Sequence, residues 1–247
     1  MKMPQLRSTV KSIESDHDVM VLAAGLGKRL RPLTDHTPKP LIQVGNRPLI
    51  DYHLEKLSSM GFHRVIINLH HLGEQIREHV TSRWGTQFDV VYSDESAELL
   101  ETAGGIRNAL PYLRHDKLIV INSDVVTDFD FRTLALPDDV SMNLVLVKNP
   151  DHHPGGDFCL APRSGTDTND GPMLLEMPHA RKETLTFSGI GVYSVAVFKS
   201  LQIGRNKLAP VIHSAIACKS ARGLVHPGLW MDVGTEDRLE AARKYFR

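Results

Sequence analysis

Cysteine is scarce in this chain, and its two positions exclude two common ways of stabilising a fold. Cys159 and Cys218 are the only cysteines among 247 residues, and neither lies in a CxxC or Cys/His spacing. Neither a disulfide framework nor a structural zinc site is supported. The thirteen histidines include pairs at 70–71 and 152–153 but no HExxH, so we expect loop and core histidines. A reducing cytoplasm is the expected location.

Excess charge and long apolar runs are also missing. The 29 Lys+Arg balance 29 Asp+Glu, so the formal net charge is +0. Without a diffuse basic field, a protein that coats nucleic acid or an anionic membrane is not expected. The longest apolar runs, such as residues 19–24, fall far short of the roughly 20 residues that a membrane helix needs. Residues 1–17 carry no apolar signal core, so we interpret them as a flexible extension.

Short β-branched runs alternate with helical patterns in most of the remaining sequence. Strands are predicted at residues 19–22, 64–68, 89–92, 117–122 and 144–148, and helices at 49–60, 72–82, 105–113 and 236–245. This βαβα rhythm predicts an α/β fold in which helices cover both faces of a mostly parallel sheet. The Pro/Gly/Asp-rich stretch 149–178 and the apolar segment 187–197 indicate a substrate-side insertion within one catalytic domain, residues 18–247.

The loop after the first strand combines glycines with cations. Gly25, Gly27, Lys28 and Arg29 follow the strand directly. Glycine lets backbone N–H groups approach phosphate oxygens, and arginine supplies a forked donor. A dinucleotide fingerprint needs a third glycine where Leu30 stands, and a Walker A loop needs Ser or Thr after Gly-Lys, so both are excluded. A surface turn is the alternative for such a loop taken alone.

A lysine fixed between two prolines follows, and the two features together suggest a family. Leu-Ala-Ala-Gly-x-Gly-x-Arg-Leu-x-Pro-Leu-Thr at residues 22–34, with Pro-Lys-Pro-Leu at 38–41, resembles the sugar-1-phosphate nucleotidyltransferases. These enzymes join an NTP to a sugar phosphate and release pyrophosphate. The resemblance covers residues 18–247. It implies a Rossmann-like, three-layer, glycosyltransferase-A-like fold with a mixed, mostly parallel sheet; no C-terminal β-helix is expected.

The resemblance also implies roles for the residues of both motifs. The loop holds the triphosphate through Ala23, Gly25, Gly27, Lys28 and Arg29, although Lys28 stands where the family usually has Ser or Thr. The lysine between the prolines, Lys39, contacts the phosphates at the reacting centre. Arg29 and Lys39 are therefore the expected electrostatic catalysts.

Two aspartates are candidates for a metal site. Asp124 follows the strand predicted at 117–122, at the sheet edge where α/β proteins bind ligands, and Asp232 lies in Trp-Met-Asp-Val-Gly-Thr. Alone, each could be a turn residue or helix cap. Mg²⁺ in phosphoryl chemistry is bound through one or two carboxylates plus phosphate oxygens, and the family resemblance implies metal binding at both positions. Ser123 replaces the glycine that usually precedes the first aspartate.

Further motifs point to the base and the sugar. Leu-Glu-Thr-Ala-Gly-Gly at 100–105 resembles the family's base loop, with Glu101 in place of glycine. The expected nucleotide contacts there are Gly104, Gly105 and, beside Asp124, Asn122. Asp157, Glu176 and Gly189 are the expected sugar-phosphate contacts, and the frequent Glu-Lys-Pro is Glu-Met-Pro at 176–178, which removes a cation.

These departures most resemble the uridylyltransferases of cell-wall recycling, which use UTP and N-acetylmuramate α-1-phosphate. Two alternatives stay open: a guanylyl- or thymidylyltransferase acting on mannose or glucose 1-phosphate, and a nucleotide-sugar sensor that binds without turnover. A dehydrogenase is excluded by the missing third glycine. The sequence leaves open whether the protein is a monomer or a dimer.

Overall fold

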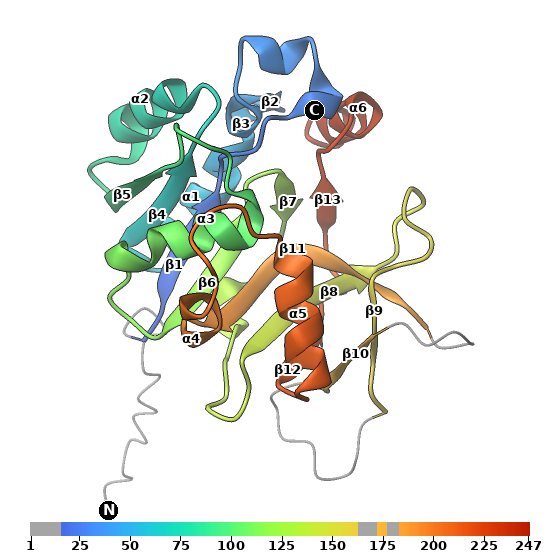
Figure 1. Cartoon of the computed structure of the whole chain (residues 1–247). Helices are drawn as coiled ribbons and strands as arrows, with labels where there is room; N and C mark the ends of the chain where they lie inside the picture. Colours follow the sequence, from blue (N-terminus) through green and yellow to red (C-terminus); the bar gives the residue numbers. More distant parts are fainter. Residues whose placement is uncertain (1–15, 163–171, 177–182) are drawn as a thin grey trace, which may run out of the picture.

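A parallel sheet of four strands forms the part of the fold that carries the site. The computed structural model describes residues 16–162, 172–176 and 183–247, so most of the extension predicted at 1–17 lies outside it. Strand β1 (Asp18–Leu22) pairs with β4 (Arg64–Leu69) and β6 (Lys117–Asn122), and β4 pairs with β5 (Asp89–Asp94). Because all four run in one direction, their carboxyl ends meet at one edge, at the top of Figure 1.

The sheet continues beyond β6 in the antiparallel sense. Strand β11 (Leu185–Ser194) pairs with β6 and with β8 (Met142–Lys148), and β12 (Ala221–Val225) extends the sheet from β8. Two short strands, β9 (Phe158–Leu160) and β10 (Leu174–Glu176), join at the start of β11. The sheet is therefore mixed, as predicted.

Helices cover both faces of this sheet. Successive side chains of β1 point to opposite faces, so both faces carry apolar side chains that a layer of helices covers. Val19 and Val21 pack in one core with α1 (Leu49–Ser59) and α2 (Gly73–Trp84). Met20 packs in a second core with α3 (Glu101–Ala109) and α5 (Leu208–Ala217). A short helix, α4 (Ala196–Lys199), follows β11. The three-layer arrangement is confirmed (Figure 1).

Smaller elements gather above the carboxyl edge of the sheet. Strand β7 (Val125–Thr127) pairs with β13 (Trp230–Asp232), and β2 (Gln43–Val44) with β3 (Arg47–Pro48). Helix α6 (Glu236–Tyr245) packs there in a third core. Short 3₁₀ turns, η2 (Lys28–Leu30), η3 (Leu33–Asp35) and η4 (Lys39–Leu41), link β1 to β2.

The structure corrects some predicted boundaries. The helix predicted at 105–113 begins at Glu101 and ends at Ala109, followed by the 3₁₀ turn η5 (Leu110–Tyr112). Pro111 explains this end, because proline has no N–H to donate to the carbonyl four residues earlier, so the α-helical hydrogen bonding stops there. The sequence patterns gave no prediction of α5 or β12. Within the described ranges, no helix is long and apolar enough to cross a membrane.

Candidate active site

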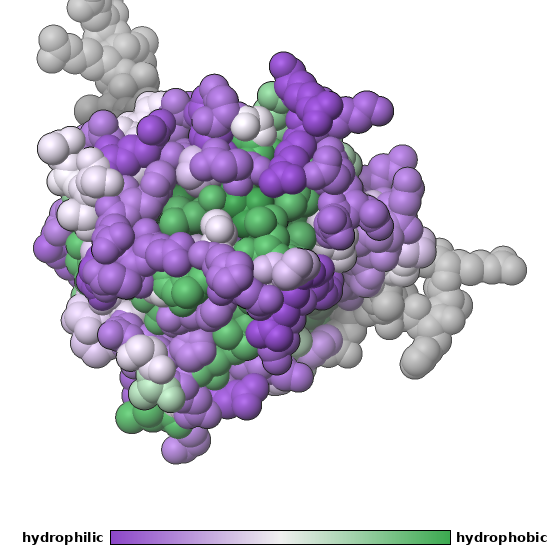
Figure 2. Space-filling view, turned by 90° about the horizontal axis from the view of Figure 1, so that it is seen from above, coloured by the Kyte–Doolittle hydropathy of each residue, from purple (hydrophilic) through white to green (hydrophobic). Residues whose placement is uncertain are grey.

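A cavity of about 310 Å³ opens at the carboxyl edge of β1, β4 and β6. Figure 2 looks onto this end of the molecule, where apolar surface lies in the middle and hydrophilic surface surrounds it. The cavity is lined by the loop after β1, the turn η4, the ends of three strands, the start of α3 and three further loops. The residues are Ala23, Ala24, Gly25, Gly27, Lys28 and Arg29 after β1; Lys39 and Pro40 in η4; Leu22, Asn68 and Asn122 near the ends of β1, β4 and β6; Glu101 and Thr102 at the start of α3; and Glu95, Leu99, Ser123, Asp124 and Gly234 in loops. Most of the nucleotide-binding residues predicted from the sequence therefore share one cavity.

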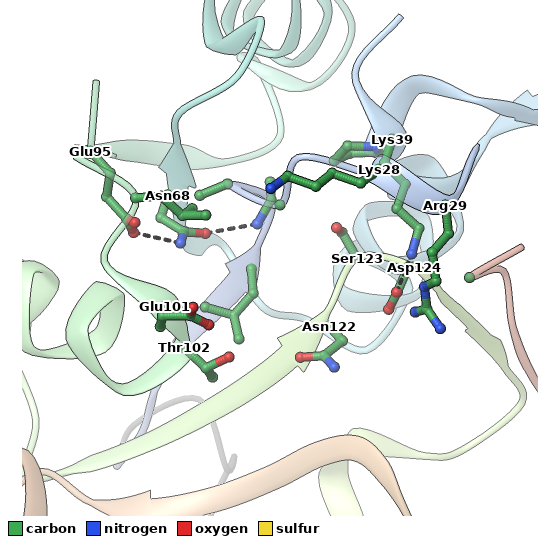
Figure 3. Close-up of a pocket in the computed structure, with 18 residues that line it drawn as sticks. Lys28, Arg29, Lys39, Asn68, Glu95, Glu101, Thr102, Asn122, Ser123 and Asp124 are labelled. Atoms are coloured by element: carbon green, nitrogen blue, oxygen red, sulfur yellow. Dashed lines mark hydrogen bonds and ion pairs between the residues drawn. The ribbon is translucent and has the colours of Figure 1, made fainter. Parts of the chain in front are cut away.

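The loop after β1 is held in a tight turn that depends on Gly27. Its φ of +61° lies in the left-handed region, and a Cβ there would stand 2.7 Å from Cγ2 of Thr34. The Thr34 hydroxyl donates a hydrogen bond of 3.0 Å to the Gly27 carbonyl. Lys28 and Arg29 follow at once, and both side chains extend beside the cavity in Figure 3. The turn therefore places two cations next to exposed backbone, as a polyphosphate loop requires.

Lys39 and Asp124 form an ion pair in the wall of the cavity (Figure 3). Lys39 opens the turn η4 between two prolines, and its side chain is only 12% exposed. Asp124 lies in the turn between β6 and β7. The lysine and the aspartate predicted to act at the reacting centre are therefore in direct contact.

The two candidate metal ligands lie at neighbouring backbone positions, Asp232 at the end of β13 and Asp124 in the turn before its partner strand β7. Asp232 faces Val125 across the β7–β13 pair, and the Val233 amide donates a hydrogen bond of 2.8 Å to the carbonyl of Asp124. Asp232 is 2.5 Å from Nη1 of Arg238. Both carboxylates therefore contact cations in the protein itself. Two oxygen donors on adjacent backbone suit Mg²⁺, which takes its remaining ligands from phosphate and water.

A buried polar network, which the sequence analysis missed, connects the cavity walls. Asn68 accepts a hydrogen bond of 2.7 Å from the Ala23 amide and donates one of 2.7 Å to Glu95. Glu95 also accepts from the amide of Leu100 at 3.2 Å. Burial raises the pKa of Glu95 above its ordinary value, partly offset by these hydrogen bonds. The network fixes the phosphate loop relative to the base loop (Figure 3).

The two glycines expected to contact the nucleotide lie behind the cavity lining, one turn into α3. A Cβ on Gly105 would stand 2.5 Å from Oε1 of Glu95, so this glycine makes room for the buried network. Gly104 packs against the backbone around Asn206, which accepts hydrogen bonds of 3.0 Å from the amides of residues 103 and 104. Glu101, at φ +61°, lines the cavity instead. A nucleotide contact for either glycine stays a prediction.

The expected sugar-side residues lie on β9, β10 and β11. Gly189, with φ +81°, packs against the side chain of Asn122, which lines the cavity. Asp157 lies apart from the cavity lining and accepts a hydrogen bond of 2.8 Å from the Phe187 amide, so it anchors the start of β11. Glu176 ends β10 opposite Phe158, and its side chain lies outside the described part.

A buried histidine lies beneath the Asp124 turn. His53 on α1 is 1% exposed, and burial lowers its pKa to about 4, partly offset by the negative charge of Asp124. The histidine of the unfolded chain titrates at its ordinary value of 6.5. Its contribution to stability is therefore complete above pH 6.5 and is lost as the pH falls toward 4, because the unfolded chain binds the proton first.

We therefore expect the unfolding free energy of His53→Gln to fall less steeply than that of the wild type as the pH is lowered. Between pH 6.5 and 4 the wild type should lose about 3 kcal/mol more unfolding free energy than the variant. Urea unfolding at several pH values, followed by tryptophan fluorescence, measures this difference. His36→Gln, at an exposed position, is the control. Parallel profiles for wild type and His53→Gln would contradict the buried neutral state.

Known proteins are similar to this chain over nearly its whole length. The family model described as Nucleotidyl transferase matches residues 18–246. The chain belongs to this family. An N-acetylmuramate alpha-1-phosphate uridylyltransferase from Neisseria meningitidis serogroup B is 43% identical over 232 residues, which cover 91% of this chain and 96% of that relative. The enzyme of the same name from Caulobacter vibrioides is 29% identical and covers 90% of this chain and 94% of its own length.

A solved structure supports the fold of this nucleotidyl transferase independently. The match is a Bacillus anthracis protein described as a glucose-1-phosphate thymidylyltransferase, with a TM-score of 0.74 and 21% identity. The alignment covers 94% of this chain and 95% of the other. The fold class and the family predicted from the two loop motifs are both confirmed.

Proposed function

We propose that this nucleotidyl transferase moves UMP from UTP to N-acetylmuramate α-1-phosphate, giving the UDP-sugar and pyrophosphate in peptidoglycan recycling. The observation that carries the proposal is the 43% identity to the Neisseria enzyme over nearly the full length of both chains. The departures from the general family pattern, such as Glu101 in the base loop, support the same subfamily. We place the reaction in the cytoplasm, where UTP is made.

The proposed reaction is an in-line attack by a sugar-phosphate oxygen on the α-phosphorus of UTP. The attacking phosphate is already anionic near neutral pH, so the protein needs no general base and acts by positioning and charge neutralisation. Arg29 and Lys28 bind the triphosphate together with the backbone around Gly25 and Gly27. Lys39 neutralises charge that develops on the transferred phosphoryl group.

Asp124 and Asp232 would hold the Mg²⁺ that this chemistry requires. Bound there, the ion would supply positive charge that offsets the charge of the phosphates and of the leaving pyrophosphate. Asp124 directly precedes β7 and Asp232 ends its partner strand β13, and the described residues contain no group of three or more acidic, histidine or cysteine side chains placed to hold a metal. Such an open set leaves coordination positions for substrate oxygens.

Two other functions use the same residues. A guanylyl- or thymidylyltransferase acting on another hexose phosphate would keep all the roles above and change only the base and sugar contacts. A nucleotide-sugar sensor would need only the binding loop. The presence of Arg29, Lys39, Asp124 and Asp232 in one site favours an enzyme.

A substrate grid tests the proposal. The protein is incubated with Mg²⁺ and each of UTP, GTP, dTTP and CTP against the 1-phosphates of N-acetylmuramate, N-acetylglucosamine, glucose and mannose, and pyrophosphate release is followed. We expect release with UTP and the muramate phosphate. Release only with another pair would keep the chemistry and overturn the substrates. Nucleotide binding without release in any well would favour the sensor.

A further inference from the structure

Arg238 lies on the first turn of α6, and two of its three guanidinium nitrogens, Nε and Nη1, have partners in the described structure. Its Nη1 lies 2.5 Å from Oδ2 of Asp232 and 2.7 Å from Nε2 of His152, and its Nε donates a hydrogen bond of 3.2 Å to the Thr235 hydroxyl. The Nη2 group has no partner among the described residues and lies against the backbone of Gly234. Since the side chain is only 17% exposed, one donor of a largely buried guanidinium is left available.

Gly234 brings a second arginine to the same place. A Cβ at this position would fall within contact distance of Nη2 of Arg238 and would stand 3.0 Å from Nη2 of Arg29. Gly234 itself lines the cavity. Two guanidinium groups from distant parts of the chain therefore meet at one point of the cavity wall, and the absence of a side chain at this glycine allows it.

The positive charges of Arg29 and Arg238 beside Gly234 are not fully balanced by carboxylates of the described residues. Arg29 has no hydrogen bond or ion pair with any described residue. Within the described ranges Asp232 is the one carboxylate that contacts Arg238, and its other oxygen is 3.2 Å from Nε2 of His152. Like charges at this separation repel unless an anion lies between them. Once Asp232 binds a divalent cation, its charge no longer neutralises Arg238, so the need for an anion becomes greater.

We propose that Arg238, supported by His152, binds the phosphate of the sugar 1-phosphate acceptor; this inference rests on the function proposed above. The triphosphate has its own binding groups in the glycine loop and Lys39, so the acceptor is the second phosphate that the reaction brings to the site. His152 belongs to the segment between β8 and β9 that also carries Asp157, on the sugar side. The frequent Glu-Lys-Pro is Glu-Met-Pro at 176–178 in this chain, so that motif offers no cation for the acceptor phosphate, and Arg238 is the one that we propose.

Isothermal titration of the sugar 1-phosphate with Mg²⁺ and no NTP measures this role without turnover. Arg238→Gln should weaken acceptor binding by about 10–100-fold, the effect of losing a charge-assisted hydrogen bond to phosphate. The KM for the acceptor should rise by a similar factor, while the KM for UTP stays within about 2-fold. Arg238→Lys should recover part of the loss. Arg243→Gln, on the exposed side of the same helix and paired with Glu240, should change neither value.

Gly234→Ala provides a second, independent variant. The φ of Gly234 is not in the left-handed region, and the new methyl meets only the flexible ends of two arginine side chains, so folding should be retained. The methyl should separate the two guanidinium groups and weaken acceptor binding in the same direction as Arg238→Gln. A thermal melt within 2 °C of wild type verifies the fold of both variants.

The outcomes separate this inference from the proposed function. Should Arg238→Gln leave acceptor affinity unchanged and instead weaken Mn²⁺ binding, measured by electron paramagnetic resonance, Arg238 acts only by positioning Asp232 and the inference is wrong. Wild-type protein that binds no sugar 1-phosphate would also overturn it. If the wild type binds a hexose phosphate other than the muramate, and Arg238→Gln weakens that binding, the inference holds and only the substrate is wrong.

Discussion

Asp124→Asn should lower kcat/KM by about 10³-fold or more, the scale of losing an electrostatic group at a reacting phosphate. Asparagine keeps the shape of the side chain but removes the charge that would bind the metal ion. It also leaves Lys39 without its partner in a site where that lysine is 12% exposed. Initial rates of pyrophosphate release at substrate concentrations well below KM measure the loss, and circular dichroism verifies the fold.

Asp138→Asn is the matched control for this substitution. Asp138 is almost fully exposed and pairs with Lys117 at the start of β6, the opposite end of that strand from Asn122 in the cavity lining. Its kcat/KM should stay within about 2-fold of wild type, because exposed ion pairs contribute little. A rate near normal in Asp124→Asn would show that this carboxylate is not part of the metal site.

Arg29→Ala should reduce kcat by about 10³-fold with almost no effect on folding. The expected loss follows from the stabilisation that an arginine gives to phosphoryl-transfer transition states. Stability should stay within about 0.5 kcal/mol, because the exposed side chain has no partner in the described structure. Single-turnover kinetics with UTP separates this loss of rate from a loss of nucleotide affinity.

Arg31→Ala, two residues further along the same loop, is the control. Arg31 forms an exposed ion pair with Asp35 and does not line the cavity. Removing it should leave kcat unchanged. Equal losses in the two variants would mean that general positive charge on the loop, and not the particular place of Arg29, assists the reaction.

The sequence predicts the parallel half of the fold well, because each of its elements is formed locally. Buried strands without polar alternation and helices with one apolar face can be recognised within about ten residues. The antiparallel half depends on partners distant in sequence. The helix α5 was missed although its apolar residues follow helical spacing. It covers the sheet face formed by Met20 and its neighbours, through Leu208, Val211, Ile212, Ala215 and Ile216.

The candidate site likewise contains residues that the sequence could predict and residues that it could not. Asn68 ends β4 and Glu95 follows β5, so the reasoning that selected Asp124 at the end of β6 could have selected both. Nothing in the sequence connects His152 to Asp232 and Arg238, because it comes from a distant segment between β8 and β9. The pair at 152–153, expected to be ordinary loop histidines, includes one that contacts a candidate metal ligand.

With the roles proposed above for Lys39 and Asp124, we expect their ion pair to make metal and triphosphate mutually dependent ligands. A divalent cation that takes Asp124 leaves the lysine without a counter-charge, and a triphosphate supplies one. Conversely, a triphosphate that attracts Lys39 frees the carboxylate for the cation. Each ligand therefore binds more tightly when the other is present, by the same factor in both directions. The ligand-free protein should therefore bind the complex of NTP and metal ion more tightly than it binds the NTP or the metal ion alone.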